Sequence, residues 1–305
     1  MVTPGRFVIS QNGVYIFFLI IKYVLMLTKQ YIEYLEIQFI HACNLACQGC
    51  ATFSELRHSG YTSWDQTKKD LLPWLDRLYP ERIGVMGGEP FINPSLKEYI
   101  IGLRELLPNT RIHLPTNGLL LLKKYDIVKM LHEMGNAVLK ISYHLDDPLI
   151  NKAIKKILND FDFKPVTEHG INRWSTKNNF KFQINAPKTF LKSFIGDYTN
   201  MKPHHSDPKE SFDICVAQRC PFLFNGQLFK CSTAGLTPWI LEKFGNPNEE
   251  LWQRYVGTGL DPDCSDSELK RYLNNFGKPH SICRQCPSQK DKDSLIDHRI
   301  NVVKK

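Results

Sequence analysis

The sequence predicts an α/β fold in which a parallel sheet curves into a barrel-like domain, followed by a smaller cysteine-rich part. From Leu35 onward, short β-branched or aromatic runs alternate with amphipathic stretches, the pattern typical of repeated βα units. A chain of 305 residues with 42% hydrophobic content is long enough to bury the core of such a fold. Cysteines cluster directly after the first predicted strand and again near the end of the chain, so two separate candidate sites are expected.

The predicted βα units occupy the first half of the chain. Strands are expected at residues 35–40, 82–86, 111–114 and 137–141. The intervening helices are marked by their start signals, because Ser63-Trp64-Asp65-Gln66 resembles a capping box and Asn93-Pro94 and Asp147-Pro148 each offer an N-cap followed by proline. Gly135 closes the helix before the fourth strand. Pro73 is expected to kink or split the first helix.

The pattern weakens beyond residue 160. A strand near residues 180–185 and a short helical piece near 190–195 are predicted there. Residues 200–209 hold two prolines, two histidines and several charges, which is typical of a connecting loop. The predicted organisation is therefore an apolar extension at 1–30, a core domain at 31–205 and a cysteine-rich domain at 206–305.

Composition limits the classes of partner. The formal net charge of +8 is modest for this length, and the nearest approach to a basic cluster, Lys152, Lys155 and Lys156, falls on a predicted helix as a solvated face. Nucleic-acid binding is therefore not indicated. Nine cysteines, grouped rather than spread, do not resemble a secreted disulfide framework and predict a reducing, cytoplasmic location. The isolated Cys264 is interpreted as structural.

Residues 14–27 form a strongly apolar segment that is short for a membrane span. The segment carries Lys22 and lacks a small-residue cleavage site. Three interpretations stay open: a non-functional extension ahead of a true start at Met26, a peripheral or membrane anchor, or an added structural element. Membrane association is expected only through these residues.

The first cysteine group is Cys43, Cys47 and Cys50, spaced by three and then two residues on the loop after the first strand. At this spacing three sulfurs can turn toward one point, and thiolate sulfur suits iron–sulfur clusters and zinc. A structural zinc site normally closes with four ligands, so a triplet without a nearby fourth cysteine favours a centre with one open position. Zinc completed by His41 or His58 is the alternative.

The CxxxCxxC loop in this position resembles the signature of the radical S-adenosylmethionine (radical SAM) superfamily. The resemblance implies a partial (β/α)6 TIM-like barrel in which Cys43, Cys47 and Cys50 hold a [4Fe-4S] cluster, and the fourth iron chelates the amino and carboxylate groups of S-adenosylmethionine. An electron from the cluster then cleaves this cofactor to methionine and a 5′-deoxyadenosyl radical, which abstracts a substrate hydrogen. Gly49 departs from the family pattern, because the residue before the third cysteine is commonly aromatic and packs near the adenine. Backbone contact with the cofactor is still expected at Gly49.

Further motifs lie where the second to fourth strands end. Gly87-Gly88-Glu89-Pro90 is similar to the family's GGE motif, in which backbone and carboxylate bind the methionine amino group. By the same resemblance Thr116 and Asn117, and Ser142 or His144, face the cofactor and substrate at the strand ends where barrel folds gather their chemistry. A plain turn at Asn117 and a local backbone contact at Ser142 are the alternatives. No catalytic side chain is assigned.

The second cysteine group comprises Cys215, Cys220, Cys231, Cys283 and Cys286. It looks like the C-terminal auxiliary-cluster modules of the SPASM or twitch kind, and Asn225-Gly226 within it suits a two-residue hairpin turn. Because the full seven-cysteine form is absent, the resemblance implies one second [4Fe-4S] cluster, on Cys231, Cys283, Cys286 and either Cys215 or Cys220. A zinc site on four thiolates is the alternative.

The motifs together predict an S-adenosylmethionine-dependent iron–sulfur enzyme that abstracts hydrogen from a substrate at the barrel mouth. Family members with such an appendage often modify peptides, so the resemblance implies a peptide or protein substrate first and a small molecule second. An external electron donor such as a flavodoxin or ferredoxin is expected. The alternative is a non-catalytic protein in which iron–sulfur centres carry electrons or a structural zinc site stabilises the fold.

Overall fold

The computed structural model describes residues 29–166, 172–245, 248–297 and 302–304. The predictions for the apolar segment at residues 14–27 lie outside this part of the chain. Within the described residues, no helix combines the length and the apolar character that crossing a membrane requires.

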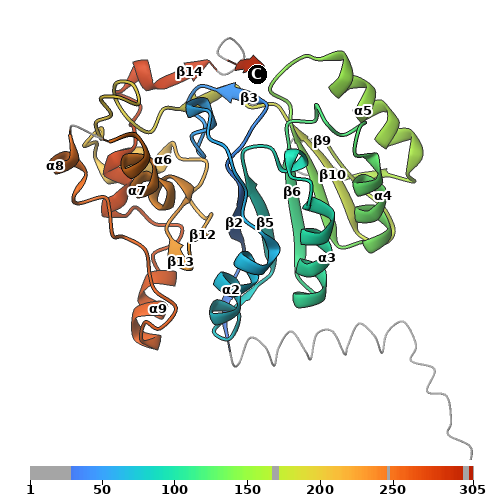
Figure 1. Cartoon of the computed structure of the whole chain (residues 1–305), viewed down its shortest axis with the longest axis horizontal. Coiled ribbons are helices and arrows are strands. Elements are labelled where there is room, and N and C mark those ends of the chain that lie inside the picture. Colours follow the sequence, from blue (N-terminus) through green and yellow to red (C-terminus); the bar gives the residue numbers. More distant parts are fainter. Residues whose placement is uncertain (1–28, 167–171, 246–247, 298–301, 305) are drawn as a thin grey trace, which may run out of the picture.

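One sheet of nine strands forms the centre of the molecule (Figure 1). Its order is β13 (Gln227–Phe229), β12 (Phe222–Phe224), β2 (Leu35–Ile40), β5 (Arg82–Gly87), β6 (Arg111–Thr116), β7 (Ala137–Ser142), β10 (Phe180–Asn185), β9 (Asn172–Ser175) and β8 (Lys164–Pro165). The strands from β12 to β10 pair in parallel, whereas β13, β9 and β8 join by antiparallel pairing. The predicted α/β class with a mostly parallel sheet is confirmed.

The helices that link the parallel strands begin at the predicted capping signals in two cases. These helices are α2 (Trp64–Leu75), α3 (Leu96–Leu106), α4 (Tyr125–Met134) and α5 (Pro148–Asp160). Ser63 accepts the backbone N–H of Gln66 at the start of α2, and Asp147 accepts that of Leu149 at the start of α5. Gly135 ends α4 with a φ of +63°, as the sequence predicts.

The helices cover one face of the sheet and leave the other face to polar residues. Phe39 of β2 packs on Tyr99 of α3 with ring centroids 4.3 Å apart, and Phe180 of β10 packs on His132 of α4 at 5.8 Å. Because successive side chains of a strand point to opposite faces, Glu36 of β2 points away from these helices. This second face is called the inner face below.

Two local predictions are wrong, and a third is wrong in part. Helix α2 continues through Pro73 to Leu75, so the proline does not split the helix, and the predicted kink stays a prediction. Helix α3 begins at Leu96 instead of at Pro94. The helical piece expected near residues 190–195 is replaced by a strand, β11 (Thr189–Leu191), which pairs with β14 (Leu295–Asp297) far along the chain.

The C-terminal half adds a hairpin to the central sheet and a set of helices beside it. The turn of the β12–β13 hairpin is Asn225-Gly226, where both residues have positive φ, so the predicted two-residue turn is confirmed. Strand β12 pairs with β2, so this half shares a sheet with the first. The helices are α6 (Pro208–Asp213), α7 (Ser232–Phe244), α8 (Glu249–Trp252) and α9 (Asp266–Leu273).

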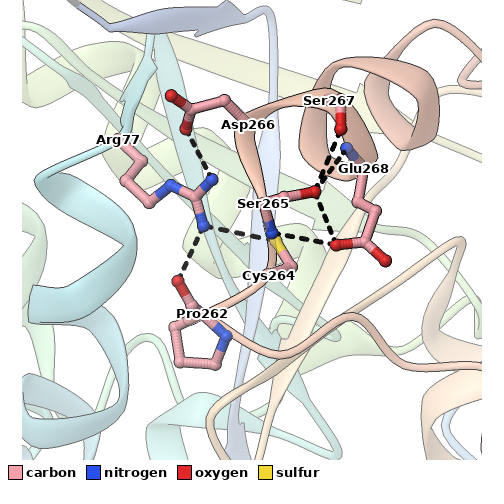
Figure 2. A network of polar contacts seen from close by, with 7 residues as sticks. All are labelled: Arg77, Pro262, Cys264, Ser265, Asp266, Ser267 and Glu268. Carbon is pink, nitrogen blue, oxygen red and sulfur yellow. Dashed lines mark hydrogen bonds and ion pairs between the residues drawn. The ribbon is translucent and has the colours of Figure 1, made fainter.

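Arg77, just after α2, fastens the segment that leads into α9 (Figure 2). Its guanidinium donates to the carbonyl of Pro262 at 2.8 Å and to the sulfur of Cys264 at 3.2 Å, and pairs with Asp266 at 2.8 Å. Cys264 is half-buried and thus takes part in a contact between two distant segments.

Besides β11–β14, two further short strand pairs lie outside the central sheet in the described residues. Strand β1 (Gln30–Ile32) pairs with β4 (Leu78–Pro80), and β15 (Val302–Lys304) pairs antiparallel with β3 (Leu45–Cys47) in the cysteine loop. Figure 1 shows the C-terminal end beside β3. The ammonium of Lys304 also pairs with the carboxylate of Asp147 at the start of α5.

Candidate metal centre and adjoining cavity

The cysteine triplet lies on the loop that leaves β2. Cys47 is buried at the end of β3, and Cys43 and Cys50 are half-buried. All three line one cavity, whose wall is completed by residues from the ends of β5, β6 and β7. The fold therefore brings three thiols to a single space at the carboxyl ends of parallel strands.

Glu55, which the sequence analysis did not single out, holds the cysteine loop through its backbone. The residue lies in a 3-10 helix, Ser54–Leu56, and accepts the N–H of Gly49 at 3.2 Å and of Cys50 at 3.1 Å. Burial raises the pKa of Glu55 to about 7, while its backbone hydrogen bonds act in the opposite direction. The bonds fix the turn that carries the third cysteine.

Gly87 and Gly88 lie where β5 meets the cysteine loop. A Cβ atom on Gly87 would stand 2.0 Å from the carbonyl oxygen of Ile40, and one on Gly88 would stand 2.0 Å from that of Ala42. Hydrogen bonds cross this contact, from Gly88 N–H to Ile40 at 2.8 Å and from Glu89 N–H to Ala42 at 2.9 Å. The close approach of two backbones therefore requires glycine at both positions.

The carboxylate of Glu89 is buried and held by three donors. One oxygen accepts the N–H of Phe91 at 3.0 Å and the hydroxyl of Thr116 at 2.8 Å, and the other accepts the N–H of Asn117 at 2.7 Å. Burial raises the pKa of Glu89 to about 7 against the effect of these bonds. Since a carboxylate offers about four acceptor sites, Glu89 can accept one further donor from the cavity that it lines.

Asn117 links the end of β6 to the cysteine loop. Its amide nitrogen donates to the side chain of Asn44 at 2.7 Å and contacts the sulfur of Cys43 at 3.9 Å. Its side-chain oxygen accepts the N–H of Leu119 at 3.1 Å, which stabilises the turn after β6. Asn117 therefore stabilises the turn after β6 and also binds the cysteine loop through Asn44.

Ser142, His144 and Phe190 form another part of the cavity wall. A Cβ atom on Gly49 would stand 3.2 Å from the Cβ of Phe190, so the segment that begins at Phe190 passes next to the glycine that precedes the third cysteine. The ring of His144 meets that of Phe190 edge-on at 5.7 Å. Because Phe190 is far from the loop in sequence, no local signal could have identified it.

The second cysteine group assembles from three segments. Cys215 and Cys220 follow α6, Cys231 is the N-cap of α7, and Cys283 and Cys286 lie in and just after a 3-10 helix, Ser281–Gln285. Local hydrogen bonds hold the outer segments, from Cys215 N–H to Phe212 at 3.1 Å and from Cys286 N–H to Cys283 at 3.1 Å.

Burial dominates the electrostatics of these thiols and raises the pKa of all five. The nearby charges of Cys231, Cys215 and Cys283 raise the pKa of Cys286 further, so these four thiols lie within electrostatic reach of one another. Cys220 differs, because after burial its strongest influence is Glu36, which is both a neighbouring charge and a hydrogen-bond partner.

Lys230 is a buried cation beside the second group. Its ammonium donates to the carbonyls of Asn275 at 2.7 Å and Lys278 at 3.1 Å, and lies 5.5 Å from the ring centroid of Phe212. The positive charge lowers the pKa of Cys215, Cys231 and Cys283 against the larger effect of burial, and so favours their thiolate forms.

The donor sets suit thiolate-bound iron–sulfur centres. The first offers three thiols on one cavity, and the second offers soft sulfur ligands that are half-buried. In the part of the chain that the structure covers, no three His, Cys, Asp or Glu side chains are grouped closely enough to hold a single metal ion. The case for a cluster therefore depends on the thiols and the cavity wall.

Comparison with protein families gives a match over the first half of the fold. Residues 37–164 match the model of the Radical SAM superfamily. A curated relative, GTP 3′,8-cyclase of Microcystis aeruginosa (strain NIES-843 / IAM M-2473), is 27% identical over 151 residues, which cover 47% of this chain and 40% of the relative. The chain thus matches less than half the length of that relative.

Two solved structures resemble the chain more distantly. BtrN in complex with AdoMet and 2-DOIA aligns with a TM-score of 0.47 and 14% identity, over 88% of this chain and 100% of that chain. Streptococcus suis SuiB bound to precursor peptide SuiA aligns with a TM-score of 0.32 and 18% identity, over 47% of this chain and 32% of that chain. At these scores neither structure bears on the chemistry of this chain.

Proposed function

Because this chain belongs to the radical SAM superfamily of enzymes, we propose that it cleaves S-adenosylmethionine reductively and abstracts a hydrogen atom from a substrate. The proposal is carried by the cavity in which Cys43, Cys47 and Cys50 face a wall containing Glu89, Thr116 and Asn117. When bound, a [4Fe-4S] cluster on the three thiolates with S-adenosylmethionine supplies a 5′-deoxyadenosyl radical. The residues of the cavity bind and orient the reactants.

Glu89 is proposed to bind the amino group of the methionine moiety. Three donors already fix both carboxylate oxygens, so the group meets an ammonium without reorganisation. The positive charge of the bound ammonium favours the ionised carboxylate of Glu89 and offsets the effect of burial on its pKa. The backbone of Gly87 and Gly88 and the side chains of Thr116 and Asn117 then line the cofactor.

The remaining cavity residues are assigned by position. Gly49 contributes backbone, and Phe190 beside it offers the aromatic surface near the adenine that the cysteine loop itself lacks. Ser142 and His144 face the substrate. Glu55 positions the loop and is expected to affect cluster loading.

A second [4Fe-4S] cluster is proposed on Cys231, Cys283, Cys286 and Cys215. Cys215 is preferred over Cys220 as the fourth ligand because Cys215, Cys231 and Cys283 all act on the pKa of Cys286, whereas Cys220 does not. After burial, the strongest influence on the pKa of Cys220 is Glu36, ahead of Cys215 and Cys231. This cluster would anchor the substrate or pass electrons. An external flavodoxin or ferredoxin would supply electrons in a reducing, cytoplasmic setting.

The substrate is proposed to be a peptide or protein, with a small molecule as the second choice. The division of the chain into a core domain at 31–205 and a cysteine-rich domain at 206–305 stays a prediction. The pairing of β12 with β2 joins the two parts in one sheet.

Product analysis tests the enzyme proposal. After anaerobic reconstitution, dithionite and S-adenosylmethionine should yield 5′-deoxyadenosine. Cys43→Ala should abolish the product, whereas Cys264→Ala, a matched substitution outside both cysteine groups, should retain it. A wild-type chain that holds its first cluster and yet makes no product would instead support a non-catalytic iron–sulfur protein.

Metal analysis tests the second cluster. About eight irons per chain are expected, because each four-iron cluster contributes four. Cys231→Ala and Cys215→Ala should each lower the iron content by about half, and Cys220→Ala should leave it unchanged. About four irons with one zinc would reject the second cluster in favour of a zinc site.

A further inference from the structure

A buried hydroxyl, that of Thr52, lies beside the third cysteine of the first group. Its oxygen is 3.3 Å from the sulfur of Cys50, and Thr52 lines the same cavity as the three thiols. That cavity adjoins the inner face of the sheet, because Ser142 also lines it and points away from Ile141 of the core. The proposed function gives the hydroxyl of Thr52 no role.

The backbone next to Thr52 is held in a strained turn. Phe53 has a φ of +56°, in the left-handed region that a bulky residue rarely adopts. Its buried ring stacks on that of Phe194 with centroids 6.2 Å apart, which holds the residue in place. Thr52 and Ser54, on either side of Phe53, both line the cavity, and their hydroxyl oxygens lie 3.4 Å apart. Strain of this kind is concentrated at functional sites, which favours a role for these hydroxyls.

The hydroxyl of Thr52 has one proton and two neighbours that can accept it. It donates to the carbonyl oxygen of Gly87 at 3.1 Å. A protonated thiol can itself donate toward Thr52, but a sulfur that ligates iron has lost its proton and can only accept. The contact between Thr52 and Cys50 is then a hydrogen bond from the hydroxyl to the sulfur, shared with Gly87. Ser54 can donate to the oxygen of Thr52 and so strengthen this bond.

The donors at Cys43 are of a different kind. Its sulfur accepts the backbone N–H of Leu45 at 3.4 Å, and this donor is part of the loop itself. The amide nitrogen of Asn117 is 3.9 Å from the same sulfur and donates to Asn44 at 2.7 Å. At Cys50, by contrast, the donor is a side-chain hydroxyl that a substitution can remove without altering the backbone.

Hydrogen bonds to the sulfur ligands of an iron–sulfur centre help to set its reduction potential. Reduction adds one negative charge, and a hydrogen bond is stronger when its acceptor carries more negative charge. A donor at a ligand sulfur therefore stabilises the reduced form more than the oxidised form. The effect is larger in a buried setting, where the local dielectric constant is low.

We infer that Thr52 donates a hydrogen bond to the sulfur of Cys50 and thereby raises the reduction potential of the cluster at the first cysteine group. The inference rests on the proposed function, because it concerns the [4Fe-4S] cluster at the same site. Thr52 acts on this cluster through Cys50.

A redox titration of the reconstituted full chain tests the inference, with the electron paramagnetic resonance signal of the reduced cluster as the readout. The first cluster is identified by the signal that Cys43→Ala lacks. Thr52→Val keeps the shape of the side chain but removes the hydroxyl, and should make reduction about tenfold less favourable. For a one-electron couple this lowers the midpoint potential by about 59 mV. Thr52→Ser should restore the wild-type potential, and Thr52→Ala replaces the Val variant if the latter does not fold.

Thr110→Val is the matched control. Thr110 is also buried and donates its hydroxyl to the carbonyl oxygen of Pro80 at 2.8 Å, much as Thr52 donates to that of Gly87, but Thr110 does not line the cavity. This variant loses a comparable hydrogen bond and should keep the wild-type potential.

The outcomes separate this inference from the proposed function. An unchanged potential in Thr52→Val, an equal fall in Thr110→Val, or a fall that Thr52→Ser does not reverse would each overturn the role of Thr52, even if 5′-deoxyadenosine is formed. A fall that Thr52→Ser reverses supports the role, even if the wild-type chain forms no 5′-deoxyadenosine and the proposed function is rejected. A first cysteine group that holds no iron would overturn both.

Discussion

The two cysteine groups differ in how the chain builds them. The first occupies residues 43–50. Glu55 holds the backbone of this loop, and Gly88 and Glu89 bond to Ile40 and Ala42 just before it. The second draws Cys215, Cys231 and Cys286 from separate segments and buries them together. The first group is thus a property of one loop, whereas the second is a property of the tertiary fold.

This difference separates the roles that bound metal would play. A centre within one loop closes only a short stretch of chain, so its loss affects chemistry more than folding. A centre that joins distant segments restricts the unfolded chain much more. Metal at the second group is therefore expected to stabilise the fold, and metal at the first to support the reaction.

The largest expected effect is on stability. Treated as cross-links, thiolates that close a loop of about 70 residues, as Cys215 and Cys286 do, stabilise by roughly 4 kcal/mol, against roughly 2–3 kcal/mol for a loop of about eight. In the reconstituted protein, Cys286→Ala should therefore lower the free energy of unfolding in urea more than Cys50→Ala. Equal losses for the two variants would show that the second group does not join its segments through metal.

Glycine substitutions sharpen the comparison. A Cβ at Gly88 would stand 2.0 Å from a backbone oxygen, whereas one at Gly226, in the turn of the β12–β13 hairpin, would find its nearest atom at 3.8 Å but would hold a φ of +77°. Gly88→Ala should lower the free energy of unfolding by about 2–3 kcal/mol and reduce iron at the first group. Gly226→Ala should lower it by about 1 kcal/mol with full iron content. If Gly226→Ala lost more unfolding free energy in urea than Gly88→Ala, the close backbone contact at Gly88 would not be the more sensitive position.

Glu89 offers a test of the first cavity alone. Because the proposed ion pair with the cofactor's ammonium is lost, Glu89→Gln should weaken S-adenosylmethionine binding by about 1.5–3 kcal/mol, or roughly 10- to 150-fold. Glu98→Gln, on the exposed side of α3, is the matched control. Equilibrium dialysis of the reconstituted variants measures the affinity of each for S-adenosylmethionine. Unchanged affinity in Glu89→Gln would remove this residue from the cofactor site.

The pH dependence of binding gives the smallest expected effect. Burial raises the pKa of Glu89 from 4.5 to about 7, so in the ligand-free fold the carboxyl is mostly protonated below pH 7. Binding an ammonium requires that proton to leave, so affinity for S-adenosylmethionine should fall by up to about tenfold per pH unit below 7. The same raised pKa makes the ligand-free fold less stable as pH rises from about 4.5 to 7. Dialysis of Glu89→Gln across this range should show a flat profile.

The sequence was informative wherever a feature depends on neighbouring residues. Ser63 and Asp147 cap helices through bonds within three residues, and Asn225-Gly226 turns a hairpin between adjacent strands. The alternation of strands and helices up to β7 follows from local apolar patterns. The family resemblance likewise depended on short motifs at strand ends.

The features that were missed depend on contacts between distant segments. Strand β11 forms only because β14 pairs with it, and Phe190 reaches Gly49 only through that placement. Glu55 carries no local signal that separates it from any other surface glutamate before the loop folds over it.

The pairing of β15 with β3 also sets an order of events during synthesis. Residues 302–304 pair with residues 45–47, so roughly 255 residues separate the two strands along the chain. At 5–20 residues per second, the ribosome needs roughly 10 to 50 s to make the stretch between them. The loop therefore takes its full form only after translation has passed residue 304, although its cysteines emerge early. Iron delivered before then would meet a loop that still lacks its edge strand.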